Sequence, residues 1–287
     1  MIADRVRMSK RKSKVGYWVH KDTNAITYFD ANADFITDGV MSRPSWVGDC
    51  SEVQIPSGVT GLGIYCFYLC ASLSSITLPE SLTSLGDMCF SNCTSLTSIT
   101  LPESVISLGG SCFYGCHSLA SITLPESLTI LGRFCFRNCS TLSSVDIPES
   151  VTSLGEACFR DCSALTSITL PENLTILENS CFRDCSALTS ITLPEGVTSL
   201  EAYCFYQCTS LTSITIPESV AILGQDCFRI CTSLTLATVL PATPPSLGGY
   251  AFNNVHSSFN IKVRSPYVDD YKTATNWVEY ANKISAI

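Results

Sequence analysis

The chain has 287 residues and a formal net charge of −8, with 46% hydrophobic and 15% charged residues. This apolar content is ample for a buried core, yet no apolar run approaches the roughly 18 residues of a membrane-spanning helix. There is no lysine between Lys21 and Lys262, and this part of the chain is acidic. The composition therefore argues against the binding of nucleic-acid phosphates by that part.

Residues 1–14 are strongly basic and lack the apolar stretch that a secretory signal requires. We expect a solvated, disordered tail, with electrostatic docking onto nucleic acid or another acidic surface as the functional alternative. Without a visible export signal, the protein stays inside the cell, leaves by another route or has a different natural start. The basic residues of this segment are Arg5, Arg7, Lys10, Arg11, Lys12 and Lys14.

Residues 15–49 are predicted to form a small N-terminal cap or linker, with an independent attachment module as the alternative. The apolar segments 17–20 and 25–29 flank the polar segment 21–24, a pattern that is typical of a β-hairpin. A stack of repeats has to close its open ends against water. A hairpin at this place in the chain would serve that purpose.

From about Cys50 to Cys231 the sequence repeats every 23 residues without a slip. A strict period of this length predicts a solenoid, in which each repeat forms one turn that stacks on the next. We assign residues 50–240 to this array. The period is carried by Pro56, Pro79, Pro102, Pro125, Pro148, Pro171, Pro194 and Pro217, and by Phe67, Phe90, Phe113, Phe136, Phe159, Phe182, Phe205 and Phe228.

Each repeat divides into the same pieces. Leu73, Ile76 and Leu78 have the spacing of a short strand that points its apolar side chains inward. The Pro-Glu pair at 79–80 forms a corner, because proline lacks a backbone donor. A second extended piece follows, and a C-F-x-x-C segment closes the turn. The apolar side chains of one turn cannot offset the cost of ordering its residues at about 1.5 kcal/mol each, so stacking is obligatory.

Seventeen cysteines are present, and sixteen of them form two columns in the C-F-x-x-C segments. Their i to i+4 spacing is expected to place both sulfurs on one side of a short helical turn. A zinc site needs four converging ligands, whereas this pattern supplies two per turn and almost no histidine. Disulfides between neighbouring turns are sterically possible. Ala251 and Val255 replace the cysteines in a degenerate ninth repeat, so we favour small, buried, free thiols.

Beyond Cys231 the period loosens, and residues 241–287 are predicted to form a degenerate last turn and a C-terminal cap. Pro241 comes one residue late, and the Pro-Pro pair at 244–245 interrupts the pattern. Residues 259–263 have the pattern of a last strand. The apolar residues of 267–287 are spaced for an amphipathic helical ending that covers the final turn.

The many copies of I-T-L-P-E-S followed by L-G-x-x-C-F-x-x-C make the chain similar to BspA-like leucine-rich repeat proteins. The ending from Ser265 to Ile284 resembles the C-terminal cap that such proteins often carry in gut Bacteroidetes. This resemblance covers roughly residues 45–287 and implies a right-handed solenoid that acts in adhesion or protein recognition at a cell surface, with no enzymatic activity. Two departures from the family stand out, namely the missing export signal and the cysteine that replaces a frequent alanine before each phenylalanine.

Two exposed rows are expected to be ordinary surface, because stacking converts each repeat position into a row. The serines and threonines on the strands, from Ser75 to Thr215, are expected to form a soluble sheet face. A second row, the Glu ridge, is expected to be solvated, although calcium or a basic partner would suit it. The Glu ridge consists of Glu80, Glu103, Glu126, Glu149, Glu172, Glu195 and Glu218.

A third row, the Tyr/Arg stripe, is the candidate binding surface. It follows each phenylalanine and varies while the core does not, and tyrosine and arginine are enriched at interface hot spots. Asp161 and Asp184 offer a plainer interpretation, because they could simply neutralise nearby arginines. Ser91 interrupts the row. The candidate binding residues are Tyr68, Tyr114, Arg137, Arg160, Arg183, Tyr206 and Arg229.

The sequence favours a non-enzymatic, protein-binding or adhesion module without a metal or cofactor. Only three histidines are present, no glycine-rich phosphate loop is found, and a uniform array offers no single unusual place for catalysis. The partner would be a protein, for instance a host matrix or surface protein, and the resemblance implies a cell-surface or secreted location. The alternative is a structural component of a virion or intracellular assembly, anchored by the N-terminal segment, in which case a cytoplasmic or virion-associated location applies.

Overall fold

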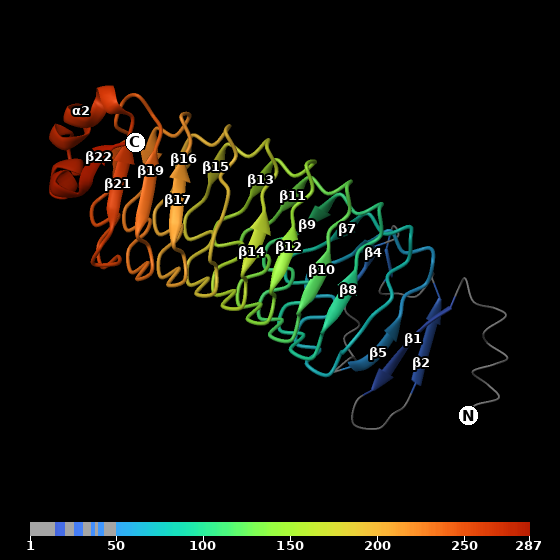
Figure 1. Ribbon diagram of the computed structural model, residues 1–287. Helices are drawn as coiled ribbons and strands as arrows, with labels where there is room; N and C mark the ends of the chain where they lie inside the picture. The colour runs from blue at the N-terminus through green and yellow to red at the C-terminus, as the bar shows by residue number, and fades with distance from the viewer. Residues whose placement is uncertain (1–14, 21–25, 31–35, 38–39, 43–49) are drawn as a thin grey trace.

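The computed structural model describes residues 15–20, 26–30, 36–37, 40–42 and 50–287. The predicted basic tail, residues 1–14, and the polar segment 21–24 of the predicted hairpin lie outside these residues. The described chain winds into a β-solenoid of about ten turns, as the 23-residue period predicts (Figure 1). Each turn has three sides: most turns carry a short parallel strand on two of them, and the C-F-x-x-C segment or its degenerate counterpart forms the third.

The first side carries the first strand row, in which the regular turns place a buried isoleucine or valine between two exposed polar residues. Ser98 pairs with Ser121, and Ser144 with Ser167, so neighbouring strands are offset by one period. The serine and threonine row is thus an exposed sheet face, as expected. The strands are β8 (Ser98–Thr100), β10 (Ser121–Thr123), β12 (Ser144–Asp146), β14 (Ser167–Thr169), β17 (Ser213–Ile216), β19 (Leu236–Val239), β21 (Asn260–Val263) and β22 (Ile284–Ala286).

The second side carries the second strand row, which corresponds to the predicted second extended piece. Its strands are two residues long and end in a buried leucine before the next corner, and the row is divided into two sheets between Leu154 and Ile176. The strands are β6 (Gly61–Leu62), β7 (Ser84–Leu85), β9 (Ser107–Leu108), β11 (Ile130–Leu131), β13 (Ser153–Leu154), β15 (Ile176–Leu177), β16 (Ser199–Leu200), β18 (Ile222–Leu223) and β20 (Ser246–Leu247).

The third side, called the turn side below, is a chain of single turns where a short helical turn was expected. Arg137 N–H bonds to Phe134 O at 3.1 Å, and Cys139 N–H bonds to Phe136 O at 3.0 Å. Phe134 and Asn138, which precede the two cysteines, have φ angles of 58° and 62°. Such left-handed residues reverse the path of the chain and prevent a continuous helix. Both cysteines nevertheless point into the core.

Neighbouring turns are joined on this side by the backbone and by a column of phenylalanine rings. Phe136 N–H donates to Cys158 O of the next turn at 2.9 Å. The rings of Phe113 and Phe136 stack with centroids 5.5 Å apart and planes 1° apart. The column continues through Phe252 of the degenerate turn, at 5.3 Å from Phe228. All nine rings of the column are buried, so the core is continuous from turn to turn.

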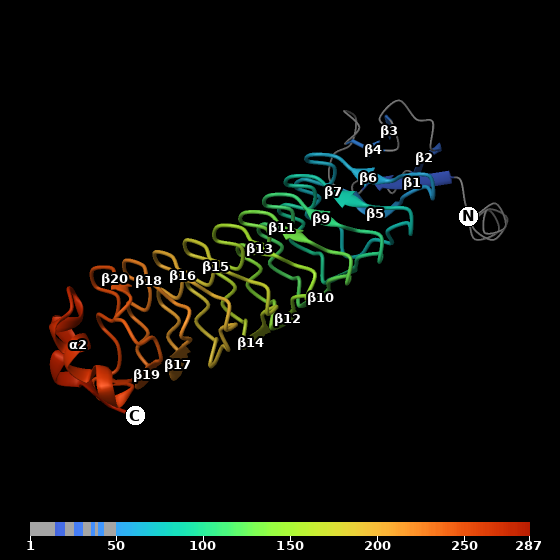
Figure 2. The same cartoon turned by 90° about the horizontal axis from the view of Figure 1, so that it is seen from above.

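The N-terminal end of the array is closed by strands, as the predicted hairpin requires. Strands β1 (Val15–His20) and β2 (Ile26–Asp30) pair antiparallel, and β1 also pairs antiparallel with β5 (Cys50–Gln54). Strands β3 (Ile36–Thr37) and β4 (Val40–Met41) also pair antiparallel, and β4 extends the second strand row by pairing with β6. Figure 2 shows these strands gathered at the N-terminal end of the solenoid.

The C-terminal end combines short helices with one more strand. A 3-10 turn (Ser265–Tyr267), helix α2 (Val268–Thr273) and a 3-10 helix η2 (Trp277–Lys283) form the expected helical ending. Their buried aromatic side chains bond to the degenerate turn, because Trp277 Nε1–H donates to Pro245 O at 2.7 Å. Residues 284–286 differ from the expectation, since they form β22 and pair in parallel with β21. The predicted last strand, β21, is therefore not the last.

Glycine at the corner after the second strand row lets neighbouring turns approach closely. A Cβ atom on Gly155 would lie 2.4 Å from Arg133 N and 2.6 Å from Gly132 C. Glu178 and Glu201 occupy the same position in two later turns, so the spacing between turns is able to adjust. The adjustment has a cost, because backbone atoms of the neighbouring turn have to move.

We expect Gly155→Ala to lower the free energy of unfolding by about 1–3 kcal/mol, as overpacked sites do. Chemical denaturation of the purified protein measures this change. Gly249→Ala is the matched control, because a Cβ there would meet no heavy atom within 4 Å. Equal stability of the two variants would show that the corner does not limit the approach of the turns.

Candidate functional site

The structure places the seven candidate residues in one row on the turn side. Each follows a phenylalanine whose ring points into the core, so its own side chain emerges on the outside of the turn. All seven are half-buried, whereas Ser91, which lies in the same row, is buried. The row is therefore a surface of partly covered tyrosines and arginines rather than of freely extended side chains.

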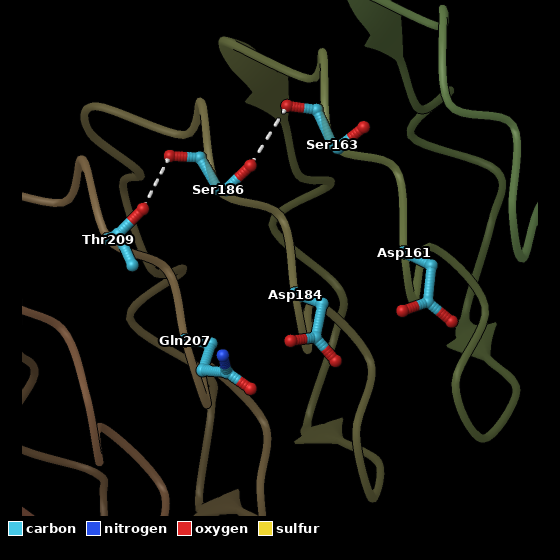
Figure 3. Close-up of a pocket in the computed structure, with 6 residues that line it drawn as sticks. All are labelled: Asp161, Ser163, Asp184, Ser186, Gln207 and Thr209. Carbon is cyan, nitrogen blue, oxygen red and sulfur yellow. Dashed lines mark hydrogen bonds between the residues drawn. The ribbon is translucent and has the colours of Figure 1, made fainter.

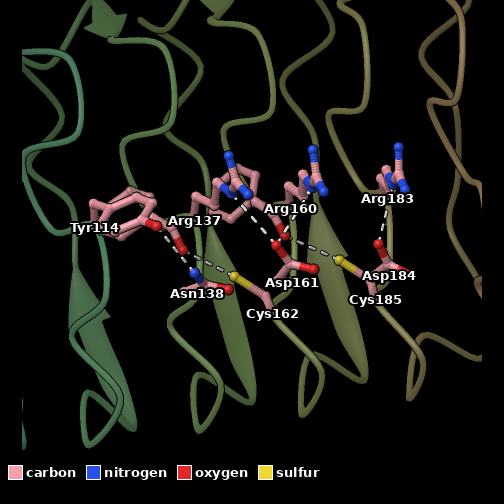
Figure 4. Close-up of polar contacts among 11 residues, drawn as sticks. Tyr114, Arg137, Asn138, Arg160, Asp161, Cys162, Arg183, Asp184 and Cys185 are labelled. Atoms are coloured by element: carbon pink, nitrogen blue, oxygen red, sulfur yellow. Dashed lines mark hydrogen bonds and ion pairs between the residues drawn. The ribbon is translucent and has the colours of Figure 1, made fainter.

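Two aspartates hold three arginines of the stripe in place. The Oδ2 atom of Asp161 lies 3.4 Å from the Nε atoms of both Arg137 and Arg160. Asp184 Oδ2 lies 3.1 Å from Arg183 Nε. In Figure 4 the three guanidinium groups lie in successive turns, each with a terminal nitrogen directed away from the carboxylates. The contacts that the plainer interpretation foresees are thus present, but they engage only the Nε side of each arginine.

Aromatic rings pack against the arginines on either side. The guanidinium carbon of Arg183 lies 4.7 Å from the ring centroid of Tyr206, and that of Arg137 lies 5.7 Å from Tyr114. Both distances are within the range of cation–π attraction. Arg229 packs in the same way against Tyr250, at 5.7 Å, and also pairs with the buried Asp226 at 3.0 Å.

Sequence reasoning missed Phe134, Tyr203 and Tyr250, which take part in these contacts. Phe134 and Tyr203 stand three residues before Arg137 and Tyr206, and an i to i+3 hydrogen bond brings each pair together. The signal was available in the sequence as aromatic residues just before some C-F-x-x-C segments. It was hidden by the expectation of a helical turn, which would place these side chains differently.

Arg160 stands at the middle of the stripe and has the fewest partners. Its Nε atom is buried without a hydrogen bond, and no aromatic ring among the described residues packs on its guanidinium group. Burial lowers the pKa of Arg160 from its ordinary value, and the charges of Arg137 and Arg183 lower it further. The positive charge at this point is therefore only partly compensated.

A shallow hollow of about 470 Å³ lies next to the stripe. Figure 3 shows its wall as two parallel rows, with the carboxylates of Asp161 and Asp184 in one and hydroxyl groups in the other. Thr209 donates a hydrogen bond to Ser186 O at 3.3 Å, and Ser186 donates one to Ser163 O at 3.4 Å. The hollow is open and polar, so it can receive side chains of a partner but does not enclose a small molecule.

The Glu ridge is exposed along its length, as expected. Glu103 Oε2 accepts a hydrogen bond from the Glu126 backbone N–H at 3.3 Å, and Glu149 does the same for Glu172 at 3.0 Å. In the described part of the chain, no three histidine, cysteine or acidic side chains cluster in a way that could hold a metal ion. No helix of that part is both long and apolar enough to cross a membrane.

The cysteines belong to the core rather than to the site. All seventeen are buried thiols that form no disulfide bond. From the second segment onward, the second cysteine donates its S–H to a phenylalanine carbonyl of the preceding turn, for example Cys139 Sγ to Phe113 O at 3.2 Å. Burial raises the pKa of Cys116 and of Cys231 from 9.0 to about 12. Such thiols stay protonated at neutral pH and are poor nucleophiles and metal ligands.

The sequence matches the family model of the BspA type leucine rich repeat region in six copies, over residues 46–166 and 155–271. These matches span most of the chain, and the solenoid has the corresponding architecture. The protein therefore belongs to the BspA-type leucine-rich repeat family. A comparison with curated proteins finds no match.

Several solved structures share this fold. A leucine-rich repeat protein from Bacteroides ovatus is 26% identical with a TM-score of 0.63, and the match covers 88% of this chain and 70% of that one. The leucine-rich repeat protein TpLRR of T. pallidum is 30% identical with a TM-score of 0.57, over 68% of this chain and 86% of its own. A leucine-rich repeat protein from Eubacterium ventriosum, at 22% identity and a TM-score of 0.54, covers 88% and 76% and shows the fold alone.

Because the thiols are buried, we expect the free energy of unfolding to fall at alkaline pH. A thiol whose pKa is raised by folding keeps its proton in the native state while the unfolded chain releases it above about pH 9. The stabilisation is therefore complete below pH 9 and is lost as the pH rises toward 12, by about 1.4 kcal/mol per pH unit for each thiol. Denaturant titrations at pH 8, 9 and 10 should show a steep fall of the unfolding free energy. A flat profile would contradict free, protonated thiols and would favour disulfides.

Proposed function

We propose that the protein is a non-enzymatic protein-binding module and that the Tyr/Arg stripe is its contact surface. The observation that carries this proposal is the row of half-buried arginines and tyrosines in neighbouring turns. Arg137, Arg160 and Arg183 are held by carboxylates, and rings of Tyr114 and Tyr206 pack against two of them. Side chains that are already ordered lose little conformational entropy on binding.

The other sides of the solenoid support the choice of the turn side as the binding surface. The first strand row and the Glu ridge present serine, threonine and glutamate at regular positions, so they offer a partner the same weakly discriminating pattern in most turns. The turn side, in contrast, changes from tyrosine to arginine and back along the array. Interface energy is usually concentrated in a few tyrosine, tryptophan and arginine residues, which makes the turn side the better binding surface.

The absence of enzymatic activity is part of the proposal. Leucine-rich repeat scaffolds are binding surfaces built by repetition, and the titratable groups of the described residues are spread along rows rather than gathered in one cleft. The family relationship supports recognition of a protein at a cell surface, with adhesion to a host matrix or surface protein as the specific form that we propose.

Charge removal in the stripe tests this function. We expect Arg160→Gln with Arg183→Gln to weaken binding of the captured partner at least about tenfold, because two hot-spot arginines are removed. The partner is captured from extracellular matrix and, in parallel, from a lysate of the producing cell, then identified and titrated. Thr123→Glu with Thr192→Glu is the matched control, since it also lowers the net charge by two at exposed positions on the first side of the solenoid.

Unchanged affinity of the arginine variant would remove the stripe from the binding surface. A third protein, lacking residues 1–14 only, keeps the strands that close the N-terminal end of the array. If capture depends on residues 1–14 and not on the arginines, the solenoid is a scaffold and the protein is a structural component that is anchored by its N-terminal segment.

A further inference from the structure

The three central arginines form a comb of outward-facing guanidinium groups. Their contacts with carboxylates all run through Nε, at 3.1–3.4 Å. Among the described residues, no group forms a hydrogen bond with the terminal Nη atoms of Arg137, Arg160 or Arg183. A guanidinium that faces its own carboxylate with Nε presents its two Nη atoms as a fork, which suits bidentate binding of a second carboxylate.

The arginines of the array are confined to this side. Within residues 50–240 there is no lysine, and all five arginines fall in or next to the C-F-x-x-C segments. Within the group of contacts itself, three arginines share two aspartates, Asp161 and Asp184, which leaves a local surplus of one positive charge. The Glu ridge, at the corner between the two strand rows, has the opposite sign. The comb is therefore the part of the array that attracts an acidic partner.

The spacing of the comb selects the shape of that partner. Phenylalanine centroids beneath the comb are 5.4 Å apart between Phe136 and Phe159 and 5.7 Å apart between Phe159 and Phe182. An α-helix repeats every 5.4 Å along its axis, about the same distance. Side chains on one face of an extended strand are about 6.8 Å apart, because two residues separate them at about 3.4 Å each. A helix therefore keeps its carboxylates in register with three successive arginines, whereas an extended acidic segment does not.

A second copy of this chain fits the comb less well. Its Glu ridge adjoins the strand rows, where neighbouring chains are about 4.8 Å apart. The difference from the comb is about 0.6–0.9 Å per turn. Over the two intervals between the three arginines the mismatch reaches about 1.2–1.8 Å, which exceeds the spread of about 0.5 Å in hydrogen-bond distances.

We infer that the comb binds the acidic face of an α-helix from a protein partner, with the helix lying along the solenoid axis. This inference rests on the proposed function of the Tyr/Arg stripe. Tyr114 and Tyr206 stand one turn before and one turn after the three arginines. The five positions span four turns, or about 22 Å, which corresponds to roughly 15 residues of helix. The partner helix then carries apolar residues at i and i+14 and acidic residues at i+4, i+7 and i+11.

Three synthetic peptides of 18 residues test the inference. The aligned peptide carries leucine, three glutamates and leucine at these positions on an alanine-rich background. The scrambled peptide has the same composition with its glutamates spread around the helix. The third peptide keeps the aligned order but contains two prolines that prevent helix formation. Circular dichroism verifies the helix content, and titration at low ionic strength measures the affinity of each peptide for the full chain.

We expect the aligned peptide to bind about tenfold more tightly than either of the others, because each of three exposed pairs contributes a factor of about two to five. This preference should disappear in Arg160→Gln with Arg183→Gln, remain in Thr123→Glu with Thr192→Glu, and weaken with added salt. Equal affinities for the three peptides, or a preference that survives removal of the two arginines, would overturn the inference.

Failure of the helix inference can be distinguished from failure of the proposed function. If no peptide is preferred but the arginine variant still loses the captured partner, the stripe is the binding surface and its ligand is not a helix. A sulfated polysaccharide, heparin, serves as an additional probe. If heparin binds in an arginine-dependent way and no peptide is preferred, the inference of a helical partner is wrong, and the comb binds another kind of polyanion.

Discussion

The structure depends on the contact of each turn with the next. A single turn buries too little apolar surface to fold alone, and its backbone groups on the turn side find their partners in the following turn, as Phe136 N–H does with Cys158 O at 2.9 Å. The phenylalanine column continues this dependence through the core, with parallel rings at 5.0–5.7 Å from Phe67 to Phe252. Stability is thus a property of neighbouring pairs of turns, and the ends need the strands and helices that close them.

The same contact determines what the surface can do. Because the backbone ladder fixes one residue per turn at each position, side chains on the outside are delivered at a constant separation. The cysteines and phenylalanines of the turn side are identical in almost all turns, and they hold the variable residues between them. Asp161, which is shared by Arg137 and Arg160, shows how a residue in one turn orients a side chain from the turn before. A binding surface arises where these repeated core positions hold surface residues that differ from turn to turn.

Much of the fold follows from the sequence, because a period of 23 residues has one simple structural solution. The two strand rows, the corner at proline and glutamate, the buried thiols and the degenerate turn at Phe252 were all predicted. The turn side was not, since the i to i+4 spacing of the cysteines fits a helical turn as well as a chain of single turns. Positive φ angles at residues as different as Phe134, Ala157 and Asp161 leave no clear mark in the sequence. The stripe itself was predictable, but its ring contacts through Tyr203 and Tyr250 depended on that missed geometry.

The late register shift shows where such an array accepts change. Ile222 pairs with Ser246, and Leu236 with Asn260, one residue more than the usual period. The extra residue lies in the corner around Pro241, while the strands on both sides stay paired and Phe252 stays on the column. Corners between strands are therefore free to lengthen, whereas the turn side is held to a fixed length by its ladder. Insertions at corners would add loops to the surface without changing the distance between the arginines of the comb.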